Sequence, residues 1–199
     1  MPSVVDISNS ALNMLGATNI ASLTEDSKAA RLVNQRYEAV RDAVFRSHNW
    51  NSLIARATLA QSATTPDFGY ALQYPLPGDC LRVLEFTNGI LSYPQDNITS
   101  NNNGPVYVIE GRNLLTDETV AKIKYVTRET DPNKYDPLLV DAISARLAYE
   151  LCYAITGSNG MIATTKTIYD EKMREARFVD ATEGAAARFE ASDLIESRF

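Results

Sequence analysis

The sequence predicts an α+β fold: a four-helix bundle formed by the N- and C-terminal helices, with an inserted small antiparallel β-sheet region and an extended C-terminal tail. Apolar residues recur at helical spacing near both ends of the chain. Between these parts, prolines and glycines separate short strand-like runs. The 199 residues, 45% of them hydrophobic and 22% charged, suit one globular domain with an insertion. The expected parts are a helical bundle (1–50 and 136–183), an inserted β region (51–135) and a C-terminal tail (184–199).

Two helices are expected in the N-terminal part. The first covers residues 3–15, which carry one apolar stripe, and Gly16 follows as the left-handed residue that often ends a helix. The second covers residues 25–47. Thr24 is its expected N-cap, and the acidic pair 25–26 would then place negative charge in the first turn.

Two more helices are expected after the β region. Asp136 is a suitable N-cap, and Pro137 suits the first helical position. Apolar residues then repeat on two adjacent faces as far as Gly157, which predicts a helix that is central among its neighbours. After a turn at 158–160, a long helix is expected from about residue 161 to residue 183.

Short apolar runs in the middle of the chain predict strands. In the last run Ala121, Ile123 and Tyr125 alternate with Lys122 and Lys124, which is the period of a half-exposed strand. The expected strands are Leu53–Gln61, Tyr70–Leu76, Leu81–Thr87, Val106–Glu110 and Val120–Val126, and the Asn-rich stretch 97–104 is expected to form a surface loop or hairpin tip.

Charge and cysteine content argue against several classes of protein. The chain carries 19 basic and 25 acidic residues, a net charge of -6, whereas a protein that wraps nucleic acid needs a basic surface. No apolar run approaches the roughly 18 residues of a membrane-spanning helix, and the N-terminus does not resemble a signal peptide. Cys80 and Cys152 are expected to be buried thiols in a protein that folds in a reducing environment.

The search for chemistry predicts no catalytic, cofactor-binding or metal-binding residues. His48, the single histidine, stands in a predicted turn, where a surface or capping role beside Trp50 is the simpler interpretation. The stretch 157–166 lacks the spacing of a phosphate-binding loop and is better explained as a turn between helices. The acidic pairs Asp117–Glu118 and Glu129–Asp131 are interpreted as solvated loop charges.

Three Arg–Phe dipeptides recur toward the C-terminus, at 177–178, 188–189 and 198–199. Three helical turns take about 10.8 residues, so a continuous helix would place the three phenylalanines on one face. Coincidence in a frayed tail is the alternative, because Gly184 weakens the continuity of a helix. Arg and Phe are both favoured at protein interfaces. We therefore predict an interface with a neighbouring chain that uses Phe178, Arg188, Phe189, Arg198 and Phe199.

Three segments, at 11–60, 70–84 and 108–158, resemble the head-to-tail adaptors of short-tailed bacteriophages, the tail tubular protein A family. The likeness lies in the ordered combination of RD..FRSHNW, LP.DCLRVL, EG..LLTD and RLAYEL..AITGS. It implies a virion protein without enzymatic activity or cofactor, made in the host cytoplasm and placed at the portal vertex of the tail. The implied partners are other copies in a ring of twelve, the portal protein, a tail nozzle similar to tail tubular protein B, and tail fibres.

The resemblance also implies that genomic DNA passes through the ring without sequence-specific binding. An acidic channel wall repels phosphates and lets DNA slide, so we expect acidic residues of the C-terminal third to contribute to that wall. Two alternatives stay open at this point. One is a head-completion or connector protein of another tailed-phage type, and the other is a small hydrolase or nucleotide-binding enzyme, against which the empty search for catalytic groups argues.

Overall fold

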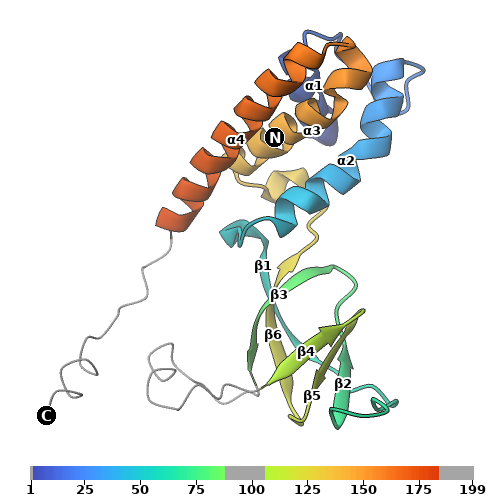
Figure 1. Cartoon of the computed structure of the whole chain (residues 1–199), viewed down its shortest axis with the longest axis vertical. Coiled ribbons are helices and arrows are strands. Elements are labelled where there is room, and N and C mark those ends of the chain that lie inside the picture. The colour runs from blue at the N-terminus through green and yellow to red at the C-terminus, as the bar shows by residue number, and fades with distance from the viewer. Residues whose placement is uncertain (1, 88–105, 184–199) are drawn as a thin grey trace, which may run out of the picture. The chain divides into compact units, whose positions relative to one another are not determined.

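The structure, a computed structural model, describes residues 2–87 and 106–183 (Figure 1). In this part of the chain it contains four α-helices and two small antiparallel three-stranded sheets, which agrees with the expected mixture of helices and an intervening β region. The helices are α1 (Val4–Met14), α2 (Lys28–Arg46), α3 (Pro137–Thr156) and α4 (Asn159–Thr182). The strands are β1 (Ile54–Leu59), β2 (Leu72–Pro75), β3 (Cys80–Thr87), β4 (Tyr107–Glu110), β5 (Asn113–Thr116) and β6 (Ala121–Thr127).

The chain divides into two compact units. The helical unit comprises the described residues up to Ile54 and those from Val126 to Glu183, and the β unit comprises the described residues between Ala55 and Tyr125. The helical unit therefore includes residues 51–54 and 126–135, which are the two ends of the region that was expected to form the insertion. The physical reason is burial: Tyr135 packs its ring edge-on against Phe45 of α2, with 5.3 Å between the ring centroids.

Helix α3 lies against each of the other three helices (Figure 1), which confirms the prediction that it is central. Its buried side chains cover two adjacent faces, as the sequence pattern indicated. The hydroxyl of Ser144 donates to the carbonyl of Ile7 at 3.1 Å and so joins α3 to α1. The buried residues of α3 are Leu139, Ala142, Ile143, Ser144, Ala145, Leu147, Ala148, Leu151 and Cys152.

The start of α2 differs from the prediction. Its N-cap is Ser27 and not Thr24, because the Ser27 hydroxyl accepts the hydrogen bond from the Ala30 amide at 3.1 Å. The first turn of α2 consequently contains no acidic residue. The carboxylate of Glu25 instead accepts from the amide of Ala21 at 2.8 Å and closes the turn that precedes the helix.

The other helix ends follow the sequence signals closely. Gly16 and Gly157 both adopt φ of +66°, the left-handed conformation expected after α1 and α3. The Asp136 carboxylate accepts from the Leu138 amide at 2.8 Å and caps α3 as predicted. Helix α4 begins at Asn159, two residues before the expected position, because the Ser158 side chain caps it.

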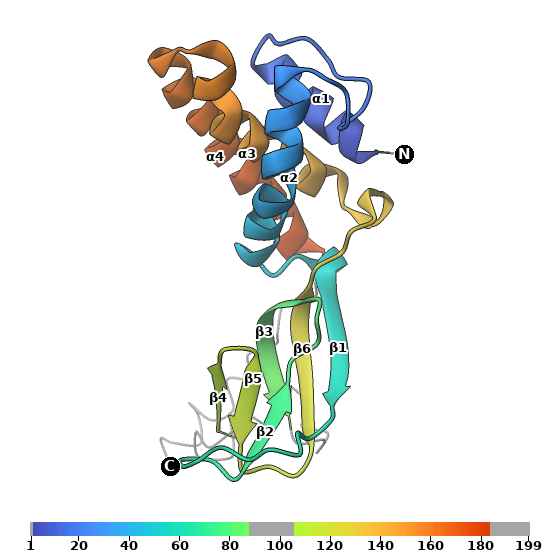
Figure 2. The same cartoon turned by 90° about the vertical axis from the view of Figure 1, so that its right-hand side faces the viewer.

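The two sheets have the strand orders β1-β6-β3 and β2-β5-β4 (Figure 2). Strand β6 alternates as predicted, with Ala121, Ile123 and Tyr125 buried, Lys122 exposed and Lys124 half-buried. These three buried side chains pack in one apolar core with Leu59, Tyr74, Cys80 and Leu114.

Strand β5 was not among the predicted strands. It follows β4 through the two-residue connection Gly111–Arg112, and the residues that flank this connection, Glu110 and Asn113, pair with each other. Gly111 adopts φ of +58°, which a tight hairpin connection requires. A glycine between two short apolar runs was the available signal, but the second run, NLLT, is only four residues long.

Some expectations lie outside the described residues. These are the loop 97–104 and the tail 184–199. Within the described residues, no helix combines the length and the hydropathy needed to cross a bilayer.

Candidate interaction surfaces

The described residues contain no group of three or more His, Cys, Asp or Glu side chains placed to hold a metal ion. In the described part of the chain neither Cys80 nor Cys152 is in a disulfide, and both are buried, as the sequence predicted. The stretch 157–166 forms the junction between α3 and α4 and the first turns of α4, which confirms a helix–helix turn. The surfaces that remain as candidates are the C-terminal end of α4 and a hollow in the β unit.

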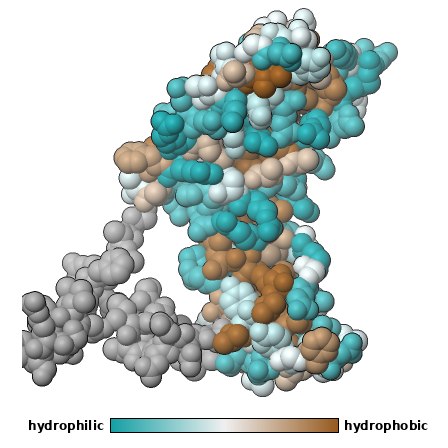
Figure 3. Space-filling view, in the orientation of Figure 1, coloured by the Kyte–Doolittle hydropathy of each residue, from teal (hydrophilic) through white to brown (hydrophobic). Residues whose placement is uncertain are grey.

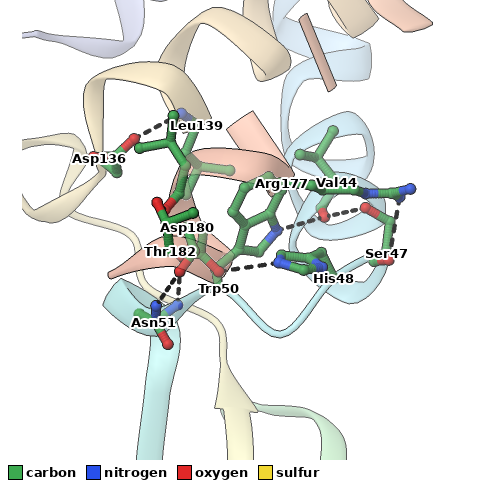
Figure 4. A network of polar contacts seen from close by, with 11 residues as sticks. Val44, Ser47, His48, Trp50, Asn51, Asp136, Leu139, Arg177, Asp180 and Thr182 are labelled. Carbon is green, nitrogen blue, oxygen red and sulfur yellow. Dashed lines mark hydrogen bonds and ion pairs between the residues drawn. The ribbon is translucent and has the colours of Figure 1, made fainter. Parts of the chain in front are cut away.

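At the end of α4, the Asp180 carboxylate binds the segment that follows α2 (Figure 4). Its Oδ2 lies 3.0 Å from Nε2 of His48, and its Oδ1 accepts from the backbone amide of Asn51 at 2.9 Å. The Asn51 side-chain amide donates in turn to the carbonyl oxygen of Asp180 at 2.6 Å. Three contacts between residues about 130 positions apart in the sequence thus hold the last turn of α4 in place.

Trp50 forms the buried side of this network (Figure 4). Its side chain is only 1% exposed, and the indole N–H donates to the carbonyl of Val44 at 3.0 Å. The His48 ring packs edge-on against the indole, with 4.8 Å between the ring centroids. The sequence placed His48 beside Trp50 correctly, but nothing local indicated its hydrogen-bond partner on α4, Asp180.

The same turn of α4 presents one predicted interface residue to solvent. Phe178 is 70% exposed, and its neighbour Arg177 donates to the carbonyl of Ser47 at 3.3 Å. Anchoring by Arg177 and Asp180 therefore fixes the position of an exposed aromatic side chain. The other predicted interface residues, Arg188, Phe189, Arg198 and Phe199, lie outside the described residues.

A second anchored aromatic group lies on the paired helices α3 and α4. The guanidinium of Arg146 stands over the ring of Tyr169 at 5.2 Å and over that of Tyr149 at 5.7 Å. Glu150 accepts from Arg146 at 2.9 Å and from Arg36 of α2 at 2.6 Å. This cluster ties three helices together, so its first role is structural. This cluster of aromatic and charged side chains could not be predicted from the sequence, because its residues come from different helices.

In the β unit, apolar side chains remain at the surface (Figure 3). The most exposed is Phe68, at 90%, on the loop between β1 and β2. Large apolar residues before, within and after β4 and β5 are also exposed. They are Val106, Val108, Ile109 and Val120.

A hollow of about 350 Å³ lies beside this loop. Its floor belongs to the β2-β5-β4 sheet, where Gln73 pairs with Leu115 and Glu110 pairs with Asn113. Leu115 is buried although it lies on the sheet face opposite Tyr74 and Leu114. The complete lining is Pro66, Asp67, Phe68, Gly69, Tyr70, Gln73, Glu110, Asn113 and Leu115.

Hydrogen bonds to the sheet hold both ends of the loop. The Ser62 amide donates to the carbonyl of Gln73 at 2.9 Å, and the Gln73 side chain donates to the Thr64 hydroxyl at 2.6 Å. At the other end the Ala71 amide donates to the Asp117 carboxylate at 2.8 Å. Asp117, which the sequence suggested was a solvated loop charge, is therefore an anchor for this loop.

Comparison with known proteins adds no family to this picture. No protein-family model matches the chain, and no curated protein matches it.

Proposed function

We propose that this chain is a structural adaptor at the head–tail junction of a short-tailed phage, where it forms a ring between the portal and the tail nozzle. The observation that carries the proposal is the ordered resemblance of residues 11–60, 70–84 and 108–158 to the tail tubular protein A family. In this proposal the four helices form a bundle that carries the β region as an insertion, and the C-terminal tail extends from it.

The placement of the family-like segments supports the proposal. RDAVFRSHNW ends α2 and includes the Trp50 and His48 contacts, and LPGDCLRVL covers the turn before β3 and half of that strand. EGRNLLTD forms the connection between β4 and β5 together with β5 itself. RLAYELCYAITGS forms the second half of the central helix α3 and its glycine cap. The motifs therefore include residues of both units.

A ring also accounts for exposed aromatic side chains in two separate places. Each protomer of a ring needs two different surfaces, because its contact with one neighbour is not its contact with the other. Phe178 at the end of α4 and Phe68 in the β unit offer two such surfaces. The proposed ring has twelve copies, with acidic residues of the C-terminal third contributing to the wall along which DNA slides.

The test is assembly with the portal protein of the same phage. We expect native mass spectrometry and negative-stain images of the mixture to show a ring of this chain on the portal. In a reconstruction, the channel wall should carry more carboxylates than Lys and Arg side chains. A chain that stays monomeric beside an intact portal ring would refute the adaptor, and a channel lined mainly by basic residues would refute the sliding wall.

A further inference from the structure

The hollow in the β unit combines negative charge with aromatic and apolar surface. Its lining includes two carboxylates, Asp67 and Glu110, and two aromatic rings, Phe68 and Tyr70, but no Lys or Arg. Among the described residues neither carboxylate takes part in an ion pair. A site of this composition fits a ligand that carries a cation next to an aromatic ring.

Arg–Phe dipeptides have that composition, and the chain contains two of them after α4, at 188–189 and 198–199. The first Arg–Phe pair is already engaged in another way, since Arg177 binds the Ser47 carbonyl on the helical unit. The other two belong to a 16-residue segment, 184–199. Fully extended, a segment of that length spans at most about 55 Å.

We propose that this hollow, beside the loop that carries Phe68, is the docking site for an Arg–Phe pair of the segment 184–199 from a second copy of the chain. The arginine lies against Asp67 and Glu110, and the phenylalanine packs with Phe68 and Tyr70 over Leu115. The volume of about 350 Å³ is at the small end of ligand pockets, which suits one aromatic side chain better than a folded partner. Only the choice of a second copy as the donor rests on the proposed ring.

The geometry of the loop favours docking over collapse. Contacts with Gln73 and Asp117 fix both ends of the loop, so the hollow is held open without a ligand. Phe68 stays 90% exposed in that arrangement and would lose much of its exposed apolar surface on docking. The site is therefore largely formed before binding, and less conformational entropy is lost when it is filled.

The experiment uses the full chain with p-benzoylphenylalanine in place of Phe189 or, separately, Phe199. Copies labelled with ¹⁵N are mixed with unlabelled copies, irradiated and analysed by mass spectrometry of the cross-linked peptides. We expect at least one of the two positions to cross-link residues 66–73 or 110–115 of the other isotopic copy. Cross-links that map elsewhere, or that join only residues of the same copy, overturn the proposal.

Charge reversal supplies the matched control. Asp67→Lys with Glu110→Lys should lower the yield of these cross-links about tenfold, because two exposed ion pairs are replaced by repulsion. Asp170→Lys with Glu171→Lys makes the same change of net charge on exposed positions of α4 and should leave the yield unaltered. Equal yields in both double variants, with native circular dichroism in each, overturn the proposed contact.

The outcome is separable from that of the proposed function. Cross-links to the hollow in a protein that never forms a ring on the portal would refute the adaptor alone. A ring on the portal whose tails cross-link to other surfaces would refute the docking site alone.

Discussion

Replacement of Asp180 by Ala tests how the end of α4 is held. The substitution removes the two contacts of its carboxylate, to His48 at 3.0 Å and to the Asn51 amide at 2.9 Å. Hydrogen bonds to charged groups contribute about 1.5–3 kcal/mol each when buried. The Asn51 amide is exposed and His48 is partly exposed, so water replaces part of the loss. We therefore expect the free energy of unfolding to fall by about 1–3 kcal/mol in total.

The assay follows from the position of Trp50. It is the single tryptophan, it is buried, and it contacts the His48 ring, so its fluorescence reports unfolding of the helical unit at this network. Urea titrations of Asp180→Ala should show a lower midpoint at an unchanged slope. Asp170→Ala, an exposed carboxylate on the same helix, should change the unfolding free energy by less than about 0.5 kcal/mol.

A double-mutant cycle isolates the pair itself. His48→Ala, Asp180→Ala and the double variant should give a coupling energy of about 0.5–1 kcal/mol. If Asp180→Ala is no more destabilising than Asp170→Ala, or if the coupling is zero, the network does not anchor α4, and our account of how Phe178 is positioned is wrong.

Three further predictions concern the helical unit. Gly157→Ala should cost about 1 kcal/mol because φ at this position is +66°. Gly160→Ala, in the first turn of α4, places the added methyl group in ordinary contact with the Ser158 hydroxyl oxygen at 3.8 Å and should be neutral or stabilising by up to about 1 kcal/mol; equal effects in thermal melts would contradict this. Burial raises the pKa of the Tyr37 and Tyr135 hydroxyls, so their contribution to the free energy of unfolding is complete below about pH 10, the pKa in the unfolded chain, and is lost as the pH rises above it. Urea titrations from pH 8 to 11 should show a steeper loss of unfolding free energy for the native chain than for Tyr135→Phe, and parallel curves would argue against this account. Leu139→Ala leaves a cavity in a fully buried part of α3 and should lower the unfolding free energy by about 2–5 kcal/mol in the same fluorescence assay, whereas a loss below 1 kcal/mol would mean that the helices repack around it.

The helices could be predicted from the sequence because their signals are local. Asp136 and Pro137 start α3, and Gly157 ends it, through contacts with residues at most four positions away. The apolar periodicity of α3 likewise predicted that it is central. The predicted start of α2 was wrong because several residues before the helix can act as its N-cap. The hydrogen bond from the Ala30 amide to the Ser27 hydroxyl shows that Ser27 is the cap.

The strands were predicted less well because their stability depends on residues that are distant in sequence. Strand β5 has only four residues, and its stability comes from pairing with β2 and β4 on its two sides. Leu115 is buried and lines the hollow beside the loop before β2, and no period-two pattern reveals this burial. Short strands carry little information by themselves because their stability lies in neighbours that are distant in sequence.

The composition, the helix pattern and the ordered motifs could thus be determined from the sequence alone, and they are the basis of the proposed adaptor. The two candidate surfaces, at the end of α4 and beside Phe68, could not be determined in this way. The pairing of His48 with Asp180 joins residues 132 positions apart, and Asp67 and Glu110, which are 43 positions apart, line one hollow beside Phe68. Contacts of this kind depend on how the chain packs in three dimensions, so only the folded structure determines which charged and aromatic groups come together.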